Sequence, residues 1–95
     1  MGPVTKATIV SMLESLHFQA VKAGLITKDQ VLLYDEGVAS GGVPPAVWLE
    51  WRGTACPFLP SMEIMPKKEQ YRIIQGAIFA LMALNINNTL GGTES

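Results

Sequence analysis

Residues 73–84 read IIQGAIFALMAL, and this stretch near the end of the chain decides how the protein can fold. Gln75 is its single strongly polar residue. A helix in a small globular domain normally keeps one face in water, whereas a helix that is apolar all round must be covered all round. One domain of 95 residues has few elements with which to cover it. We therefore expect a partner, most simply a second copy of the chain, to shelter part of this helix.

The helix that contains this stretch is predicted to span residues 66–86. Pro66 suits the first helical turn, where its missing amide hydrogen costs nothing, and Asn87-Asn88 is predicted to end the helix. The first turns are amphipathic and basic, and the second half is apolar. Small residues would permit close approach of another helix: Gly76, Ala77, Ala80 and Ala83. The side chains expected to meet a partner on this helix are Ile74, Ile78, Phe79 and Met82.

The composition supports association and argues against several other functions. The chain is 48% hydrophobic and 16% charged, whereas a typical soluble domain is about 25% charged. A net charge of −1 gives no support to nucleic acid or acidic membranes as partners. A single cysteine and a single histidine exclude a disulfide framework within one chain and the common zinc sites. We expect no metal and no cofactor.

The apolar run has consequences for location. Residues 73–86 make a run of about 14 residues, shorter than the roughly 18–20 needed to cross a bilayer. The N-terminus lacks a recognisable secretory signal, because Glu14 and His17 interrupt the first apolar stretch. The sequence therefore predicts a cytoplasmic protein that does not associate with membranes.

A first helix is predicted over residues 5–23. Its apolar residues recur at three- and four-residue spacing, as in an amphipathic helix: Ile9, Leu13, Leu16, Ala20 and Ala23. Gly24 follows directly, where a positive φ ends many helices. Residues 30–34 are short, apolar and β-compatible, which favours a strand. Thr27 and Gln30 also have the spacing of a helix capping box, which leaves a helical alternative.

Residues 46–59, AVWLEWRGTACPFL, are predicted to form a β-hairpin. Arg52-Gly53 supplies a two-residue turn, and Pro57 places the second arm at the edge of the sheet. This turn pairs Trp51 with Thr54, Leu49 with Cys56 and Val47 with Phe58. The residues expected on the core face are Val47, Leu49, Trp51, Cys56 and Phe58. Trp48 falls on the opposite face, either exposed as an interface residue or covered by the loop over residues 35–45.

The element order is helix, three strands, helix. The most economical packing is an α+β two-layer sandwich, in which both helices lie on one face of a small antiparallel three-stranded sheet. We expect one domain over residues 1–95, with residues 1–4 and 89–95 loose.

This order resembles that of the double-stranded-RNA-binding domain. Lysines at the start of the second helix contact phosphates in that family, and Lys67, Lys68 and Arg72 lie at the matching position here. The order of the elements agrees with that family over most of the chain, but only these three residues match its motif. It implies RNA binding through them. The loop over residues 41–45, GGVPP, lacks the histidine that the family places in the minor groove.

No set of reactive groups converges in the sequence. His17 has no second group for catalysis or metal binding, and we expect backbone or water to satisfy it. Cys56 is expected to be a buried small hydrophobe. Adjacent Asp35 and Glu36 point apart and suit a turn. Because catalysis needs positioned acid, base or nucleophile groups, we do not expect an enzyme.

The loop DEGVASGGVPP, residues 35–45, suggests an alternative. Backbone amides at Ser40, Gly41 and Gly42 could bind an anion, although the lysine and helix of a phosphate-binding loop do not follow. A small ligand or nucleotide could then stack on Tyr34 or Trp48 beneath this loop.

The favoured hypothesis is a small, non-enzymatic protein-interaction module. It would form a homodimer through its C-terminal helix and meet another protein through Trp48 and the glycine-rich loop. Small accessory or phage-like mobile-element proteins often have this character. The alternatives are the small-ligand binder with residues 35–45 as a lid, and the double-stranded-RNA binder.

Overall fold

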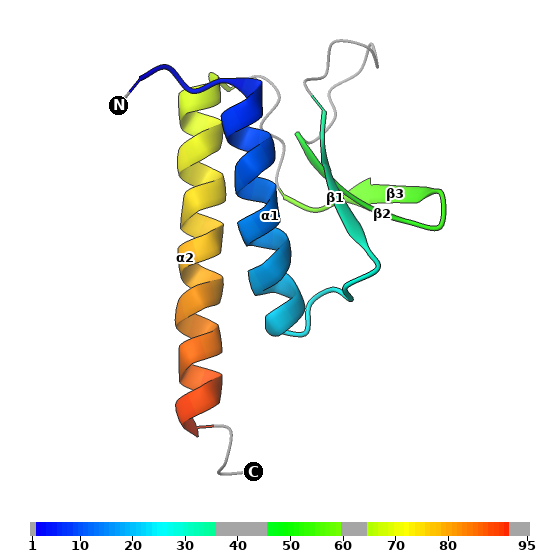
Figure 1. Cartoon of the computed structure of the whole chain (residues 1–95), viewed down its shortest axis with the longest axis vertical. Helices are drawn as coiled ribbons and strands as arrows, with labels where there is room; N and C mark the ends of the chain where they lie inside the picture. Colours follow the sequence, from blue (N-terminus) through cyan, green and yellow to red (C-terminus); the bar gives the residue numbers. More distant parts are fainter. Residues whose placement is uncertain (1, 36–45, 60–64, 92–95) are drawn as a thin grey trace.

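The computed structural model describes residues 2–35, 46–59 and 65–91 (Figure 1). Along the chain, helix α1 comes first, three strands follow, and helix α2 comes last. The bounds are α1 Lys6–Lys22, β1 Val31–Tyr34, β2 Val47–Trp51, β3 Thr54–Pro57 and α2 Lys67–Gly91. The predicted α-β-β-β-α order and the α+β class are therefore confirmed.

The three strands form one antiparallel sheet in the order β1-β2-β3. Leu49 pairs with Cys56 and Trp51 with Thr54, as the two-residue turn predicts. Arg52 and Gly53 have φ values of 51° and 81°. Positive φ at both central positions is the geometry that matches the twist of paired strands, and glycine adopts it without strain. Pro57 lies on the edge strand, where its missing N–H breaks no ladder bond.

Both helices lie on the same side of the sheet, and α1 lies between α2 and β1 (Figure 1). One cluster of buried side chains joins these layers: Ile9, Leu13, Leu16, Leu32, Ala46, Val47, Ile74 and Ile78. A hydrogen bond adds a polar link, because the Tyr34 hydroxyl donates to Gln70 Oε1 at 2.6 Å. The core thus depends on α1, which contacts both the sheet and α2.

The ends of α1 follow from local sequence. Thr5 is the N-cap, and its side chain accepts a hydrogen bond from the Thr8 N–H at 3.3 Å. Gly24 follows the helix with φ 79°, and its N–H donates to Val21 O at 3.0 Å. This geometry satisfies carbonyls that the helix end would leave open.

The segment after α1 forms the predicted strand and not the helical alternative. Thr27 N–H does donate to Gln30 Oε1 at 2.7 Å, as in a capping box. Gln30 N–H donates back to Thr27 O at 3.1 Å, which closes a turn. The chain then extends into β1, because its apolar run is too short for a helix and pairs with β2.

Helix α2 continues beyond its predicted end. Asn87-Asn88 lies within the helix, which reaches Gly91, and the Thr89 hydroxyl donates to Asn85 O at 2.9 Å. Asparagine lowers helix stability by only a fraction of a kcal/mol, roughly 0.7 at most, so two of them do not stop a helix. Residues 89–91 were expected to be loose and are helical, whereas residues 92–95 lie outside the described part.

The predicted core face of the hairpin is only partly covered. Val47 is buried, but Trp51 is 43% exposed and Cys56 is exposed. Among the described elements, α1 packs along β1, and α2 reaches the sheet near its start, where Gln70 meets Tyr34. The turn between β2 and β3 points away from the helices (Figure 1), so no described element covers this end of the hairpin. The expectation of a buried Cys56 thiol is therefore wrong.

Candidate interaction surface

Helix α2 presents two different faces. The face toward α1 carries buried residues at helical spacing, including Gln70, Ile74, Ile78 and Asn85. The opposite face has no described element against it (Figure 1). Exposed residues follow one another there at spacings of three and four: Gly76, Phe79, Ala83, Ile86 and Leu90. We call these five residues the α2 seam.

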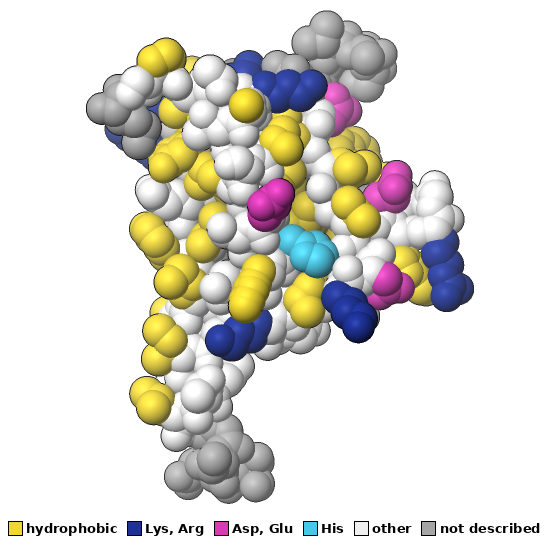
Figure 2. Space-filling model, viewed as in Figure 1, with side chains coloured by type: hydrophobic (Ala, Val, Ile, Leu, Met, Phe, Trp, Pro, Cys, Tyr) yellow, Lys and Arg dark blue, Asp and Glu magenta, His cyan; other side chains and the backbone are white. Residues whose placement is uncertain are grey.

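The α2 seam is apolar and open. Phe79 is 59% exposed, Ile86 58% and Leu90 77%. Met82 and Leu84 beside the seam are also exposed, and Figure 2 shows hydrophobic side chains projecting along this edge of the molecule. The sequence of α2 contains no charged residue after Arg72. Contiguous exposed apolar surface of this kind marks a site of interaction with protein or membrane.

The spacing of the seam is that of a helix–helix contact. Alternating steps of three and four residues are the heptad pattern by which two helices pack along their length. Gly76 and Ala83 lie within this row, and a Cβ built at Gly76 meets nothing within 4 Å. Because the distance between packed helices depends on the side chains at the contact, these small residues let a second helix come close.

Of the four interface residues that the sequence predicts on this helix, two lie on its free side and two lie in the core. Phe79 and Met82 lie on the free side, as expected. Ile74 and Ile78 instead lie in the core of the subunit, with exposures of 0% and 9%. They cannot contact a partner while α1 is in place. The apolar run carried no sign of which side α1 would occupy, so sequence periodicity could not separate the two faces.

Trp48 lies on the sheet face away from the helices and is half-buried. Its indole Nε1 is buried and has no hydrogen-bond partner among the described residues. Pro57 pairs with it across the hairpin, as predicted. Trp48 is therefore neither open nor fully covered, and it is a weaker interface candidate than the α2 seam.

Asn85 is a polar contact between the helices that sequence reasoning missed. It is 4% exposed. Its Nδ2 donates to Gln19 O at 3.1 Å and to Gln19 Oε1 at 2.7 Å. Its Oδ1 is buried without a partner in the described part of the chain. A lone polar residue in an apolar helix often fixes the register between helices. An asparagine at position 85 of the otherwise apolar helix was therefore the sequence feature that could have indicated a helix–helix contact there.

We expect Asn85→Asp to destabilise the fold far more than Asn85→Leu. The carboxylate would lose both donated bonds and face two acceptors of Gln19, which costs about 3 kcal/mol or more for a buried unpaired charge. Leucine removes the unpartnered Oδ1 together with the donor. Gln19 O keeps the Ala23 N–H, and only the half-buried Gln19 Oε1 loses its donor, so the cost should be about 1 kcal/mol, at the lower end for an unpaired group. Urea denaturation at one protein concentration measures both. Equal losses for the two variants would contradict the assigned hydrogen bonds.

The basic start of α2 is small and partly neutralised. Lys67 is half-buried, and Lys68 and Arg72 are exposed. Arg72 Nη1 lies 3.4 Å from Glu69 Oε1. An exposed pair of this kind adds little stability, but it reduces the local positive charge.

The remaining predicted site residues that the structure describes do not form one reactive site. The predicted satisfaction of His17 is confirmed, since its Nε2 donates to Gln30 O at 2.6 Å. Tyr34 is held by Gln70, as described above. Ser40, Gly41 and Gly42 lie outside the described residues, as does the rest of the predicted ligand lid after Asp35. Across residues 2–35, 46–59 and 65–91, no group of three or more His, Cys, Asp and Glu side chains could hold a metal ion.

A polar cluster at the hairpin tip was also not foreseen. The Thr27 hydroxyl donates to Asp29 Oδ1 at 2.5 Å, and Trp51 Nε1 donates to Asp29 Oδ2 at 3.0 Å. These hydrogen bonds, Thr27 first, lower the pKa of Asp29 below its ordinary value of 3.8. The Arg52 guanidinium lies 4.5 Å from the centre of the Trp51 ring. The exposed Trp51 is thus held against the turn before β1.

Helix α2 is longer than the apolar run that the sequence suggests. The helical segment Lys67–Leu90 has 24 residues, and an 18-residue window within it has a mean hydropathy of 1.4, so it is long and apolar enough to cross a membrane by length and composition. Only 11% of its apolar window is buried inside the subunit. Two kinds of partner could therefore cover the α2 seam: a second helix or the apolar interior of a membrane. Comparison with protein-family models, with curated proteins and with solved structures gave no match to this chain.

Proposed function

We propose that this protein is a small, non-enzymatic interaction module that self-associates through the α2 seam. The observation that carries the proposal is the heptad row of exposed apolar residues on the side of α2 away from α1. We also expect a reducing, cytoplasmic compartment, in which the exposed Cys56 thiol stays free.

The seam is suited to pairing with itself. In an antiparallel pair centred on Ala83, Leu90 of one copy meets Gly76 of the other, and Phe79 meets Ile86. Leu90 then lies beside a small residue, Phe79 and Ile86 lie beside each other, and Ala83 meets Ala83 at the centre, where the two helices can approach closely. The same arrangement separates the Lys68 and Arg72 ends of the two helices, which a parallel pair would bring together. A second copy is therefore the occupant that the seam favours.

A bilayer is a poorer occupant of the same surface. Helix α1 packs along α2, with Gln70 and Asn85 buried near the ends of the contact. A membrane-spanning α2 would have to release α1 or carry it into lipid, and α1 bears Lys6, Glu14 and Lys22 on its exposed side. Charged side chains in the middle of a bilayer cost about 2.5–3.5 kcal/mol each even by lenient scales.

Disulfide cross-linking at Ala83 tests the proposal directly. In a Cys56→Ser background, Ala83→Cys places a thiol at the centre of the seam, where the two copies meet in either helix orientation. We expect mild oxidation to convert most of the protein to a covalent dimer. Ser15→Cys, on the exposed side of α1, is the matched control and should stay monomeric.

Two outcomes would contradict self-association. One is an equal yield of covalent dimer from both cysteine positions. The other is flotation of the protein with phosphatidylcholine vesicles, accompanied by loss of cross-linking and by protection of the Ala83→Cys thiol from a water-soluble maleimide. The second result would assign the seam to lipid.

A further inference from the structure

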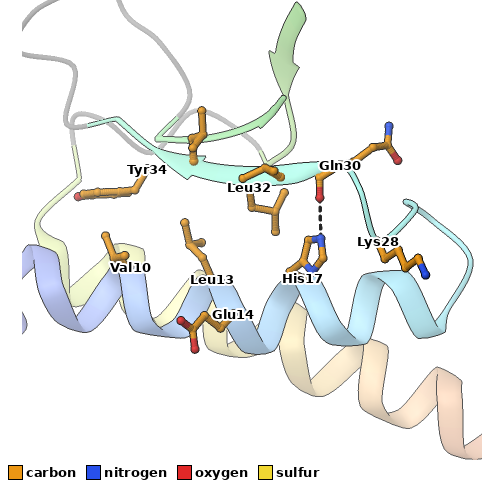
Figure 3. Close-up of a pocket in the computed structure, with 10 residues that line it drawn as sticks. Val10, Leu13, Glu14, His17, Lys28, Gln30, Leu32 and Tyr34 are labelled. Atoms are coloured by element: carbon orange, nitrogen blue, oxygen red, sulfur yellow. Dashed lines mark hydrogen bonds between the residues drawn. The ribbon is translucent and has the colours of Figure 1, made fainter. Parts of the chain in front are cut away.

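Strand β1 forms one edge of the sheet and borders a cleft of about 550 Å³ beside α1 (Figure 3). The α1 side of the cleft is lined by Val10, Leu13, Glu14 and His17. It lies between α1 and the sheet, whereas the α2 seam faces away from both. The two surfaces are therefore separate, and the cleft needs its own explanation.

The backbone of β1 can accept another strand at this edge. Asp35 N–H donates to Ala46 O at 2.8 Å. Because hydrogen-bonded and non-bonded positions alternate in an antiparallel pair, this bond directs the amides of Val31 and Leu33 toward β2. The N–H and C=O of Leu32 then point toward the open edge. Gln30 O has the same orientation, and His17 already donates to it from α1 (Figure 3).

Within Val31–Tyr34 the edge lacks proline, charge and a bulge, which are features that usually prevent pairing. Exposed edge strands are commonly protected by proline, by charged side chains or by bulges. The opposite edge, β3, carries Pro57. The sequence of β1 is VLLY, without proline or charge, and its four residues pair with β2 in unbroken register. At the Gln30 end, the carbonyl oxygen already accepts the His17 hydrogen bond.

The side chains beside this edge match those of an extended apolar segment. Val10 is 45% exposed and lines the cleft beside Leu13 on α1, facing β1 (Figure 3). Val31 and Leu33 are 47% and 41% exposed on the other face of the sheet. A strand added to β1 would place alternate side chains against Val10 and against Val31 and Leu33, because successive side chains of a strand point to opposite faces.

Two charges define the polar requirements of the occupant. Lys28 lies at one end of the cleft, and Glu14 lies on α1 farther along it (Figure 3). Both side chains are exposed, and neither forms an ion pair within the described part of the chain. An occupant with a carboxylate near Lys28 and a basic side chain near Glu14 would complement both charges.

We infer that the β1 cleft binds an extended apolar segment of a partner protein by strand addition. The segment carries an acidic residue at the Lys28 end and a basic residue beside Glu14. Main-chain hydrogen bonds to Leu32 supply affinity, and the cleft supplies side-chain selection, as in other strand-addition sites. The volume of the cleft lies within the range of about 300–1,000 Å³ that is typical of binding pockets.

A random heptapeptide display library, panned against the purified full-length protein, provides the probe. We expect enriched peptides with alternating apolar residues and one acidic and one basic position. The synthetic peptide should bind with a Kd in the micromolar range by fluorescence anisotropy. Hydrogen exchange of the Leu32 amide, followed by NMR, should slow at least about tenfold at saturation. The peptide with its edge-facing amide N-methylated is the matched control and should bind at least tenfold more weakly.

Substitutions in the cleft separate this site from others. Val10→Arg fills the cleft and should weaken peptide binding at least tenfold, while Glu14→Lys should reverse the preference for a basic residue. Circular dichroism confirms that each variant is folded. The inference is overturned by absence of enrichment, by peptide binding that leaves the Leu32 amide unprotected, or by protection of that amide through self-association alone. The first two results leave the α2 seam unaffected, whereas the third would place self-association at the β1 edge.

Discussion

Phe79→Glu should convert the protein from a dimer to a monomer over the concentrations at which the wild type is paired. The substitution buries a carboxylate from each copy in an apolar contact, and breaking a contact in this way costs about 3–5 kcal/mol. Such a loss weakens the Kd by at least about 100-fold. Phe79 is 59% exposed in the isolated subunit, so the fold itself should be unaffected. Sedimentation velocity measures the change.

The control for Phe79→Glu is Ser15→Glu on the exposed side of α1. It adds the same charge to the same fold but lies away from the seam, so it should leave the dimer intact. Circular dichroism should show unchanged helix content for both variants. A Phe79→Glu protein that sediments as the wild type does would remove the α2 seam as the site of self-association.

Ile74→Ala and Ile86→Ala should have opposite consequences, although the two substitutions are chemically identical and lie in one helix. Ile74 is fully buried against α1, and truncating such a side chain costs about 2–5 kcal/mol. Ile86 is 58% exposed in the subunit, so its truncation should change the free energy of unfolding by about 0.5 kcal/mol or less. It should instead weaken self-association about tenfold, through the lost apolar contact.

The stability half of this comparison requires monomers. Urea denaturation in a Phe79→Glu background measures the unfolding free energy without a contribution from dissociation. The association half is measured with Ile86→Ala alone, by sedimentation. Equal loss of stability from the two substitutions would show that α2 has no free face, and the assignment of its two sides would fail.

Local signals in the sequence accounted for much of the fold. Gly24 marked the end of α1 because a positive φ is needed there. Arg52-Gly53 set the hairpin register, since a two-residue turn leaves only one pairing. These features depend on residues that are neighbours along the chain, and a single sequence contains that information.

The extent of burial could not be predicted in the same way. The alternation in β2 correctly placed Trp51 and Cys56 on the helix-facing side of the sheet, yet both are exposed because no described helix reaches the end of the hairpin. Strand periodicity identifies the face of a residue but not the length of the layer packed against it. That length depends on where α1 lies, which is a property of the whole fold.

The α2 seam illustrates a related limit. The sequence showed an excess of apolar surface but assigned Ile74 and Ile78 to the partner, because a helix apolar on all sides has no visible orientation. Once α1 is placed, the heptad row on the remaining side becomes apparent. Asn85 and Gln19, which meet across the two helices, are 66 residues apart in the chain, and their pairing has no local signature.

The two proposed surfaces would act together in a dimer. Pairing through the α2 seam leaves the β1 cleft of each copy on the far side of α1. A dimer would therefore offer two clefts to a partner that carries two suitable segments. Linking two binding events in this way raises the apparent affinity through effective concentration, without any new contact.

Sedimentation equilibrium of the wild-type protein is the most direct test of the central claim, that α2 exposes apolar surface which a second copy covers. Over roughly 1–500 μM, a range chosen to bracket micromolar association, we predict a transition from the monomer mass of 10.3 kDa to twice that mass. A single species of 10.3 kDa at the highest concentration would contradict the claim.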